Sequence, residues 1–320
     1  MEPPKAPSRP PSREVDLLLV IYLAVIVFSI LYPSTFFSWE NARAILNNLA
    51  ADGIVAVGMM ALLIAGVFDL SVGSTLSMAG VITGGLLAVR NWPVAAAVAA
   101  GLAAAGAGGW LNGVLVARLR VNALITTLGN LLIFGGVALL VGGPSIVNLP
   151  REFTWIGQAE DPFLRLQIPV WFMLVLAASA HLLLRNTRSF RQLYYVGSNR
   201  KAARLSGIRV ERIQILAFTL TGILAGAAGL ATAARFSTAV SNAGVGAELR
   251  VITAVILGGA SLSGGKGTIA GALIGVLFIA LIQNTILTAD VPPHWHSIVV
   301  GCILILALIL DAVQNRARES

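Results

Sequence analysis

Long apolar segments with almost no charged residues recur along the chain, and they constrain its fold more than any other feature. The longest lie at residues 17–31, 94–117, 168–184, 213–234, 268–288 and 297–310. A helix that crosses a bilayer needs about 20 mostly apolar residues. Charged residues make up 11% of the chain, against about 25% in soluble domains. The sequence therefore predicts an all-α integral membrane protein, because little of it can form a water-facing surface.

Shorter apolar segments bring the expected total to about ten transmembrane helices, some of them short or broken by glycine. These segments lie at residues 50–67, 72–89, 121–141 and 249–260. We expect one transmembrane domain over residues 16–312. A disordered, proline-rich cytoplasmic tail is predicted at residues 1–15, and a short cytoplasmic tail at residues 313–320.

The distribution of basic residues predicts the orientation. Residues 185–212 contain eight Lys or Arg residues against a single acid, Glu211, whereas residues 142–167 contain two Arg residues against three acids. Cytoplasmic loops carry the excess of Lys and Arg, so the first loop is expected inside and the second outside. An even number of crossings then places both the N- and the C-terminus in the cytoplasm. Much of the formal charge of +8 lies in the first of these loops, next to the inner leaflet of the bilayer, where positive charge is expected. No nucleic acid is therefore expected as a partner.

The stretch LGGASLSGGKGTIAG, residues 257–271, resembles a phosphate-binding loop but lacks two of its requirements. Ala260 stands where the motif needs its first glycine, and Gly267 follows Lys266 where the motif needs Ser or Thr. We therefore expect a tight glycine turn instead of a nucleotide site. Lys266 is then either an anchor at the headgroups or a residue that faces a cavity.

A second stretch, FDLSVGS at residues 68–74, places an acid after an apolar run. Asp69 has two compatible interpretations. It is an N-cap for a helix that begins at residue 72, or an ionisable group on a transport path inside the membrane. Its pattern is also similar to the SLSGGKG of residues 261–267, which suggests an internal repeat.

The stretch YVGSNRKAARLSGI, residues 195–208, predicts a short exposed helix in the cytoplasmic loop. Ser198 or Asn199 can cap its N-terminus, and Gly207 can end it. Ala202, Ala203 and Leu205 would form a small apolar face. A helix of this length is not stable alone, and we therefore expect a partner surface to hold it. The alternative is an ordinary basic loop that lies on the inner leaflet.

This loop resembles the coupling motif of permease subunits in bacterial ABC importers. The stretches at residues 68–74 and 257–271 are similar to the other two signature stretches of ribose-type sugar permeases, within the superfamily that includes branched-chain amino acid permeases. The similarity runs from about residue 45 to residue 312. It implies a permease subunit of a binding-protein-dependent importer, located in the bacterial inner membrane, that moves a sugar or sugar-like solute by alternating access.

The same resemblance implies the partners and the site residues. The partners are cytoplasmic ABC ATPase subunits, a periplasmic sugar-binding protein and a second permease subunit, identical or different. The chain itself would be no enzyme and would need no cofactor. The residues expected to couple the chain to the ATPase are Gly197, Asn199, Ala202, Ala203, Leu205, Ser206 and Gly207. The residues expected on the substrate pathway are Asp69, Ser71, Asn130, Ser261 and Asn284.

Two other function classes fit fewer of these features. An ion-coupled secondary transporter needs charged groups inside the bundle, and Asp69 is the clear candidate. An intramembrane enzyme needs a catalytic constellation, and a metal site needs more ligands than His294 and His296, so neither is expected. Residues 235–250 and the outer loop 142–167, with Trp155, are expected to face the binding protein.

Overall fold

The computed structural model describes residues 13–31, 36, 38–289, 291–292 and 294–319, and most of them are helical. Most of the expected N-terminal tail lies outside the described residues. The first half of the chain forms α1 (Arg13–Leu31), α2 (Trp39–Ile64), α3 (Val72–Ala88), α4 (Val94–Gly113), the π-helical turn η1 (Val114–Arg118) and α5 (Ala123–Gly142).

The rest of the chain continues the bundle and adds the short helices α6, α8, α9 and α11. Its helices are α6 (Arg151–Gln158), α7 (Ile168–Asn186), α8 (Arg188–Ser198), α9 (Arg200–Leu205), α10 (Val210–Phe236), α11 (Ala247–Leu257), α12 (Ile269–Thr288) and α13 (His294–Glu319). The two strands, β1 (Ser145–Ile146) and β2 (Ala239–Val240), pair antiparallel. The region 313–319, expected as a tail, continues α13 as helix.

Six helices within the described residues are long and apolar enough to cross a membrane. They are α2, α4 together with η1, α5, α7, α10 and α12. Three shorter apolar helices lie at Leu17–Ile30, Val72–Ala88 and His294–Ile309. Many of their large apolar side chains face outward, as expected where lipid is the solvent. The predicted all-α, multi-pass membrane protein is confirmed.

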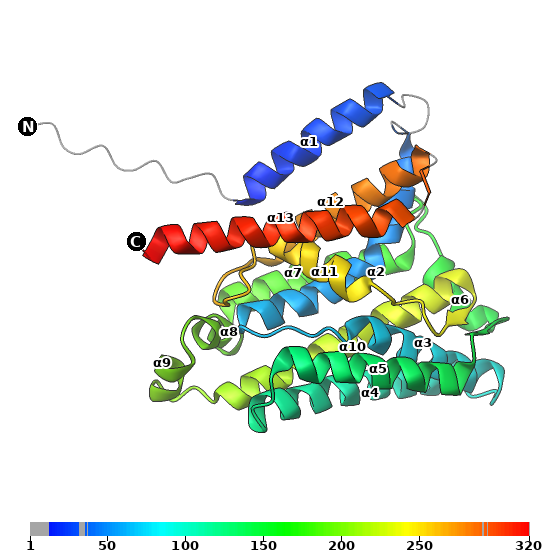
Figure 1. Ribbon diagram of the computed structural model, residues 1–320. Coiled ribbons are helices and arrows are strands. Elements are labelled where there is room, and N and C mark those ends of the chain that lie inside the picture. Colours follow the sequence, from blue (N-terminus) through cyan, green and yellow to red (C-terminus); the bar gives the residue numbers. More distant parts are fainter. Residues whose placement is uncertain (1–12, 32–35, 37, 290, 293, 320) are drawn as a thin grey trace, which may run out of the picture.

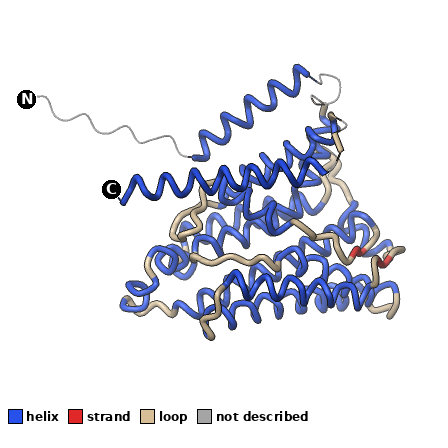
Figure 2. The backbone as a smooth tube through the Cα atoms, in the orientation of Figure 1, coloured by secondary structure: helices blue, strands red, loops and turns tan. Residues whose placement is uncertain are grey.

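The long helices run roughly along one common direction, so the bundle has two distinct ends (Figure 1). One end carries α8, α9 and the last residues of α13; we call it the α9 end. The opposite end carries α6 and the β1–β2 pair, which Figure 2 shows in red; we call it the α6 end. The basic loop and the loop expected outside therefore lie at opposite ends of the bundle.

Glycine allows α10 to pack closely against α4 near the middle of the bundle. A Cβ added at Gly109 would lie 2.3 Å from the Phe218 carbonyl oxygen, and one added at Gly222 would lie 2.5 Å from the Ala105 oxygen. Both distances are too short for any side chain. Small residues at such crossings let helix backbones approach closely, which is the main source of helix association in lipid.

Two segments of the bundle, residues 65–88 and 241–257, are helical over only part of their length. We call them the interrupted segments. Residues 65–71 run from the α9 end back into the bundle in irregular form before α3 begins (Figure 1). Residues 241–246 do the same from the other side before α11 begins. The two helix starts meet, because the Gly244 N–H donates to the Ser77 hydroxyl at 2.9 Å and a Cβ at Gly73 would lie 2.2 Å from the Gly244 oxygen.

This arrangement corrects the expected internal repeat. Residues 68–74 lead into α3 inside the bundle, whereas residues 261–267 form a loop between α11 and α12 at the α9 end. The positional counterpart of the α3 start is the α11 start at residues 241–247, which approaches from the opposite side. The similarity between the two sequence stretches therefore does not mark equivalent positions.

Candidate functional site

The predicted coupling helix is present as α9, and its two ends form as the sequence indicates. The Asn199 side-chain oxygen accepts a hydrogen bond from the Ala202 N–H at 3.0 Å, so Asn199 is the N-cap. Gly207 follows the last turn with φ +79°, a conformation that favours glycine. The helix spans Arg200–Leu205, slightly shorter than the sequence suggests.

The apolar residues of α9 do not share one face, contrary to the expectation. Ala203 is 4% exposed and packs with Val196 and Val210 of the same chain. Leu205 is 91% exposed, and Ala202 is exposed beside it. A six-residue helix with 3.6 residues per turn separates positions 203 and 205 by about half a turn. Leu205 is therefore the apolar side chain that a partner protein can contact.

Four glycines join the coupling loop to two other parts of the chain at the α9 end. A Cβ on Gly197 would lie 1.8 Å from the Ile64 oxygen and 2.6 Å from the Gly265 nitrogen. A Cβ on Gly264 would lie 2.8 Å from the Gly66 Cα. We call Gly66, Gly197, Gly264 and Gly265 the glycine junction. Here the end of α8 contacts both the segment that leads into α3 and the loop between α11 and α12.

Hydrogen bonds reinforce the glycine junction. The Gly265 N–H donates to the Ile64 carbonyl at 2.9 Å. Arg200, in α9, donates from Nη2 to the Gly66 carbonyl at 3.0 Å, and the Tyr194 hydroxyl donates to the Gly267 carbonyl at 2.9 Å. Helix α9 is thus bound to the segment that leads into α3, and α8 is bound to the loop that follows α11.

Glycines within residues 257–271 allow the close backbone packing at the glycine junction. Gly264, Gly265 and Gly267 have φ of +86°, +73° and +139°, so they form the tight turn that the sequence predicts. Ser261 is buried in the same loop, and Lys266 is exposed there. Backbone atoms of Gly66 and Gly197 pack closely against this turn.

Asp69, Ser71 and Asn130 come together in a closed polar network inside the bundle. The Asp69 carboxylate accepts from the Ser71 N–H at 2.7 Å and from the Ser71 hydroxyl at 2.6 Å. Asn112 Nδ2 donates to Asp69 at 3.0 Å and to the Ser71 hydroxyl at 2.8 Å. Asn130 donates to the Asn112 side-chain oxygen. Asp69 is 1% exposed and Ser71 fully buried, so the network joins α3, α4 and α5 without an opening to solvent.

The network changes the expected role of Asp69 at the start of α3. Ser71 occupies the N-cap position and makes no side-chain capping hydrogen bond. Asp69 instead accepts from the N–H two residues ahead and fixes the turn before the helix, which is a common use of aspartate in turns. The predicted N-cap at Asp69 is therefore wrong.

Asn284 and Ser261 lie apart from this network. Asn284 is close to the end of α12, and its Nδ2 donates to the Asn41 side-chain oxygen at 2.7 Å. Its own side-chain oxygen is buried without a partner among the described residues. Since Ser261 lies at the α9 end, the five residues predicted on the pathway fall in three separate places.

A polar cavity of about 170 Å³ lies where the interrupted segments meet α2, α10 and α12. It borders a second cavity of about 240 Å³, and the two share Leu76, Thr232, Phe236 and Ala243 as lining residues. We call the pair the junction cavity. Its charged and amide-bearing lining residues are Asn47, Asn48, Asp52, Arg235, Arg250 and Gln283. Residues 235–250 were expected to face the binding protein, whereas Arg250 lies in α11 and pairs with Asp52 inside this cavity.

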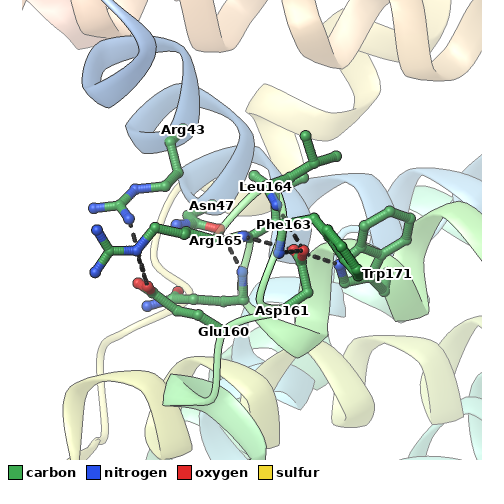
Figure 3. A network of polar contacts seen from close by, with 10 residues as sticks. Arg43, Asn47, Glu160, Asp161, Phe163, Leu164, Arg165 and Trp171 are labelled. Atoms are coloured by element: carbon green, nitrogen blue, oxygen red, sulfur yellow. Dashed lines mark hydrogen bonds and ion pairs between the residues drawn. The ribbon is translucent and has the colours of Figure 1, made fainter.

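Another polar network holds the outer loop between α6 and α7 (Figure 3). The Asp161 carboxylate accepts from the N–H groups of Phe163, Leu164 and Leu166 at 2.7 to 2.9 Å and from the Trp171 indole at 3.2 Å. The Leu164 bond is the main cause that lowers the pKa of Asp161 to about 2. Asp161 is therefore ionised at neutral pH and fixes the loop.

Replacing Asp161 with Asn is expected to make this loop several-fold more sensitive to trypsin at Arg165, because neutral Asn binds the three N–H groups less strongly. The stabilisation that the carboxylate provides is complete above its ordinary pKa of 3.8 and is lost as the pH falls through about 2. The difference should thus be the same at pH 6 and pH 8. Glu160→Gln is the matched control, since Glu160 makes only long contacts with Arg43 and Arg165, at 3.4 and 3.6 Å. Equal cleavage of both variants would contradict the prediction.

Comparison with known proteins relates the sequence of this chain to a known family. Residues 41–308 match the model of the branched-chain amino acid transport system / permease component family. The ribose import permease protein of Escherichia coli (strain K12) is 37% identical over 93% of both chains. An L-arabinose ABC transporter permease protein of Azospirillum brasilense is 34% identical over 95% of this chain and 89% of its own. The autoinducer 2 import system permease protein of Salmonella paratyphi B is 34% identical over 94% and 86%. No solved structure matches.

Proposed function

The chain belongs to the branched-chain amino acid transport system / permease component family, and we propose that it is the membrane-spanning permease subunit of a binding-protein-dependent ABC importer. Its cargo would be a sugar or a sugar-like solute, as the names of its ribose, arabinose and autoinducer 2 relatives suggest. The observation that carries the proposal is the glycine junction. It connects the end of α8, which leads into the exposed helix α9, to the start of one interrupted segment and to the loop that follows the other.

The proposal includes ten crossings and a multi-pass position in the bacterial inner membrane. Six long helices, three shorter apolar helices and α11 with its preceding segment make up these ten. The basic residues around α8 and α9 favour the cytoplasm for the α9 end. An even number of crossings then brings both termini to that side, and the contact between Glu14 and Thr268 at the α9 end supports this for the N-terminus.

The mechanism is alternating access driven from outside the chain. Cytoplasmic ATPase subunits would hold α9 through the exposed Leu205, and their closure on ATP would move α8 and α9. Because Gly197 contacts the Ile64 oxygen and Gly265 without free space, this movement would shift the start of the first interrupted segment and the loop that follows the second. A second permease subunit would complete the pathway, and a periplasmic binding protein would deliver the substrate to the α6 end.

The ion-coupled alternative has less support. Such a transporter needs a charged group that an ion can reach. Asp69 is enclosed by Ser71, Asn112 and Asn130, and Asp52 is paired with Arg250. The relatives described above are permease components of import systems.

Affinity purification of the tagged chain from its native host tests the proposal. An ABC ATPase should copurify, and the addition of ATP and substrate-loaded binding protein should drive solute into vesicles that contain the complex. If no ATPase binds and the purified chain alone moves solute down an ion gradient, the proposal is wrong.

A further inference from the structure

The junction cavity combines features that are costly to place inside a membrane protein. A charged side chain within the bilayer region costs several kcal/mol and is usually kept for function. Interrupted helices at such a depth typically border a substrate site. The junction cavity lies at both interruptions, because Leu76 of α3 and Ala243 and Ala247 at the α11 start line its wall.

The ion pair in this cavity is geometrically well formed. Arg250 Nε donates to Asp52 Oδ2 at 3.1 Å, and Arg250 Nη2 donates to Asp52 Oδ1 at 3.3 Å. This two-point contact neutralises both charges, yet the side chains remain 22% and 18% exposed. The remaining lone pairs of the carboxylate and the remaining N–H groups of the guanidinium are therefore available to a neutral ligand that carries both donors and acceptors.

The lining of the junction cavity also includes a second cation and an aromatic ring. Arg235 donates to the Asn47 carbonyl and to the Asn48 side-chain oxygen, each at 2.8 Å. Its guanidinium lies 5.2 Å from the centre of the Phe236 ring, and Phe236 is 62% exposed. Such a ring offers an apolar platform for the C–H face of a flat, polar ligand. The Gln283 amide also lines the cavity and makes no hydrogen bond to another described residue.

We propose that the junction cavity is a recognition site for an uncharged polyol, with Asp52, Arg250 and Gln283 as partners of its hydroxyl groups and Phe236 as its stacking surface. This inference rests on the proposed function and adds to it the place and the chemistry of substrate recognition. A sugar hydroxyl can donate to Asp52 and accept from Arg250 while the ion pair stays closed. The ammonium of a zwitterionic amino acid would have Asp52 as its acidic partner in the lining and would have to displace Arg250 from it.

A cysteine-protection experiment on the purified chain tests the site without any partner. Cys302 is replaced by Ala, and Ala243→Cys places a thiol on the exposed wall that both cavities share. The rate of modification by a membrane-impermeant maleimide is measured with D-ribose, L-arabinose, D-glucose or L-leucine. A bound sugar at about ten times its half-protecting concentration should slow the reaction about tenfold by occupancy alone. Asn242→Cys, next to it but outside both linings, is the control and should stay unprotected.

Variants then distinguish recognition from a structural role. Gln283→Leu and Phe236→Ala should raise the half-protecting concentration at least about tenfold. The charge exchange Asp52→Arg with Arg250→Asp should restore the thermal stability lost in either single variant but not the protection. Recovery of both stability and protection would make the pair purely structural and would overturn its role in recognition.

Each result decides the question. Protection by L-leucine instead of the sugars, or no protection by any of them, overturns the proposal. If the exchanged pair does not yield a stable protein, Gln283→Leu and Phe236→Ala still test the site, and unchanged protection in both overturns it. The assay needs no ATPase, so sugar protection without a copurifying ATPase would support the site and reject the importer. A copurifying ATPase without sugar protection would support the importer and reject the site.

Discussion

Leu205→Asp is expected to abolish the binding of the ATPase subunits while the chain itself folds normally. Leu205 is 91% exposed at the tip of α9, so its replacement removes no contact within the chain. In a complex, burial of this side chain contributes about 2 kcal/mol, and an aspartate in the same pocket adds a desolvation cost. We therefore expect at least about a thirtyfold loss of affinity. Pull-down of the ATPase and thermal unfolding of the variant measure the two effects separately.

Leu205→Met is the matched control, because it keeps an apolar side chain of similar volume, and it should retain the ATPase. Ala203→Arg does not test the same contact: Ala203 is 4% exposed and packs on Val196 and Val210, so arginine there would disrupt the chain's own structure. Normal ATPase binding by a stably folded Leu205→Asp variant would contradict the assignment of α9 as the docking helix.

Gly197→Ala is expected to uncouple ATP hydrolysis from transport. The added methyl group would lie 1.8 Å from the Ile64 oxygen and 2.6 Å from the Gly265 nitrogen, and both of these are backbone atoms. The end of α8 must therefore move away from the junction, which costs about 1–3 kcal/mol as overpacking usually does. Transport should fall to near background while ATP hydrolysis and ATPase binding persist, because Leu205 remains exposed. Solute uptake and ATP hydrolysis by the same vesicles measure this ratio.

A milder pair of changes controls for a folding defect in Gly197→Ala. Tyr194→Phe with Arg200→Ala removes the hydrogen bonds to the Gly267 and Gly66 carbonyls and leaves the glycine packing intact. This double variant should fold normally and show partial uncoupling. Full coupling in both Gly197→Ala and the double variant would mean that the junction does not transmit the movement.

Local features of the fold could be predicted from the sequence. Apolar length identified the spans, and Asn199 and Gly207 marked the limits of α9 because a side-chain cap and a positive φ depend on neighbouring residues alone. The missing glycine at Ala260 and the missing hydroxyl at Gly267 likewise argued against a phosphate loop, and the structure places backbone packing there.

Features that depend on long-range packing could not be predicted in this way. Asp52 and Arg250 are 198 positions apart, and Arg250 entered the sequence analysis as part of an outer segment. The direction of Ala203 depends on contacts with Val196 and Val210, which a short helix does not encode by itself. Asp69 was expected as an N-cap or on a transport path, whereas the closed network around it depends on Asn112 and Asn130 from two other helices.

The most direct measurement of the central claim is the reactivity of Ala243→Cys in the complex with its ATPase, with and without ATP. If the glycine junction carries the movement of α9 to the interrupted segments, ATP should change the rate of thiol modification in the otherwise native complex. The same addition should leave the rate unchanged in a complex that carries Gly197→Ala, or should change it less in the Tyr194→Phe, Arg200→Ala variant. An equal response to ATP in all of these complexes would contradict the account.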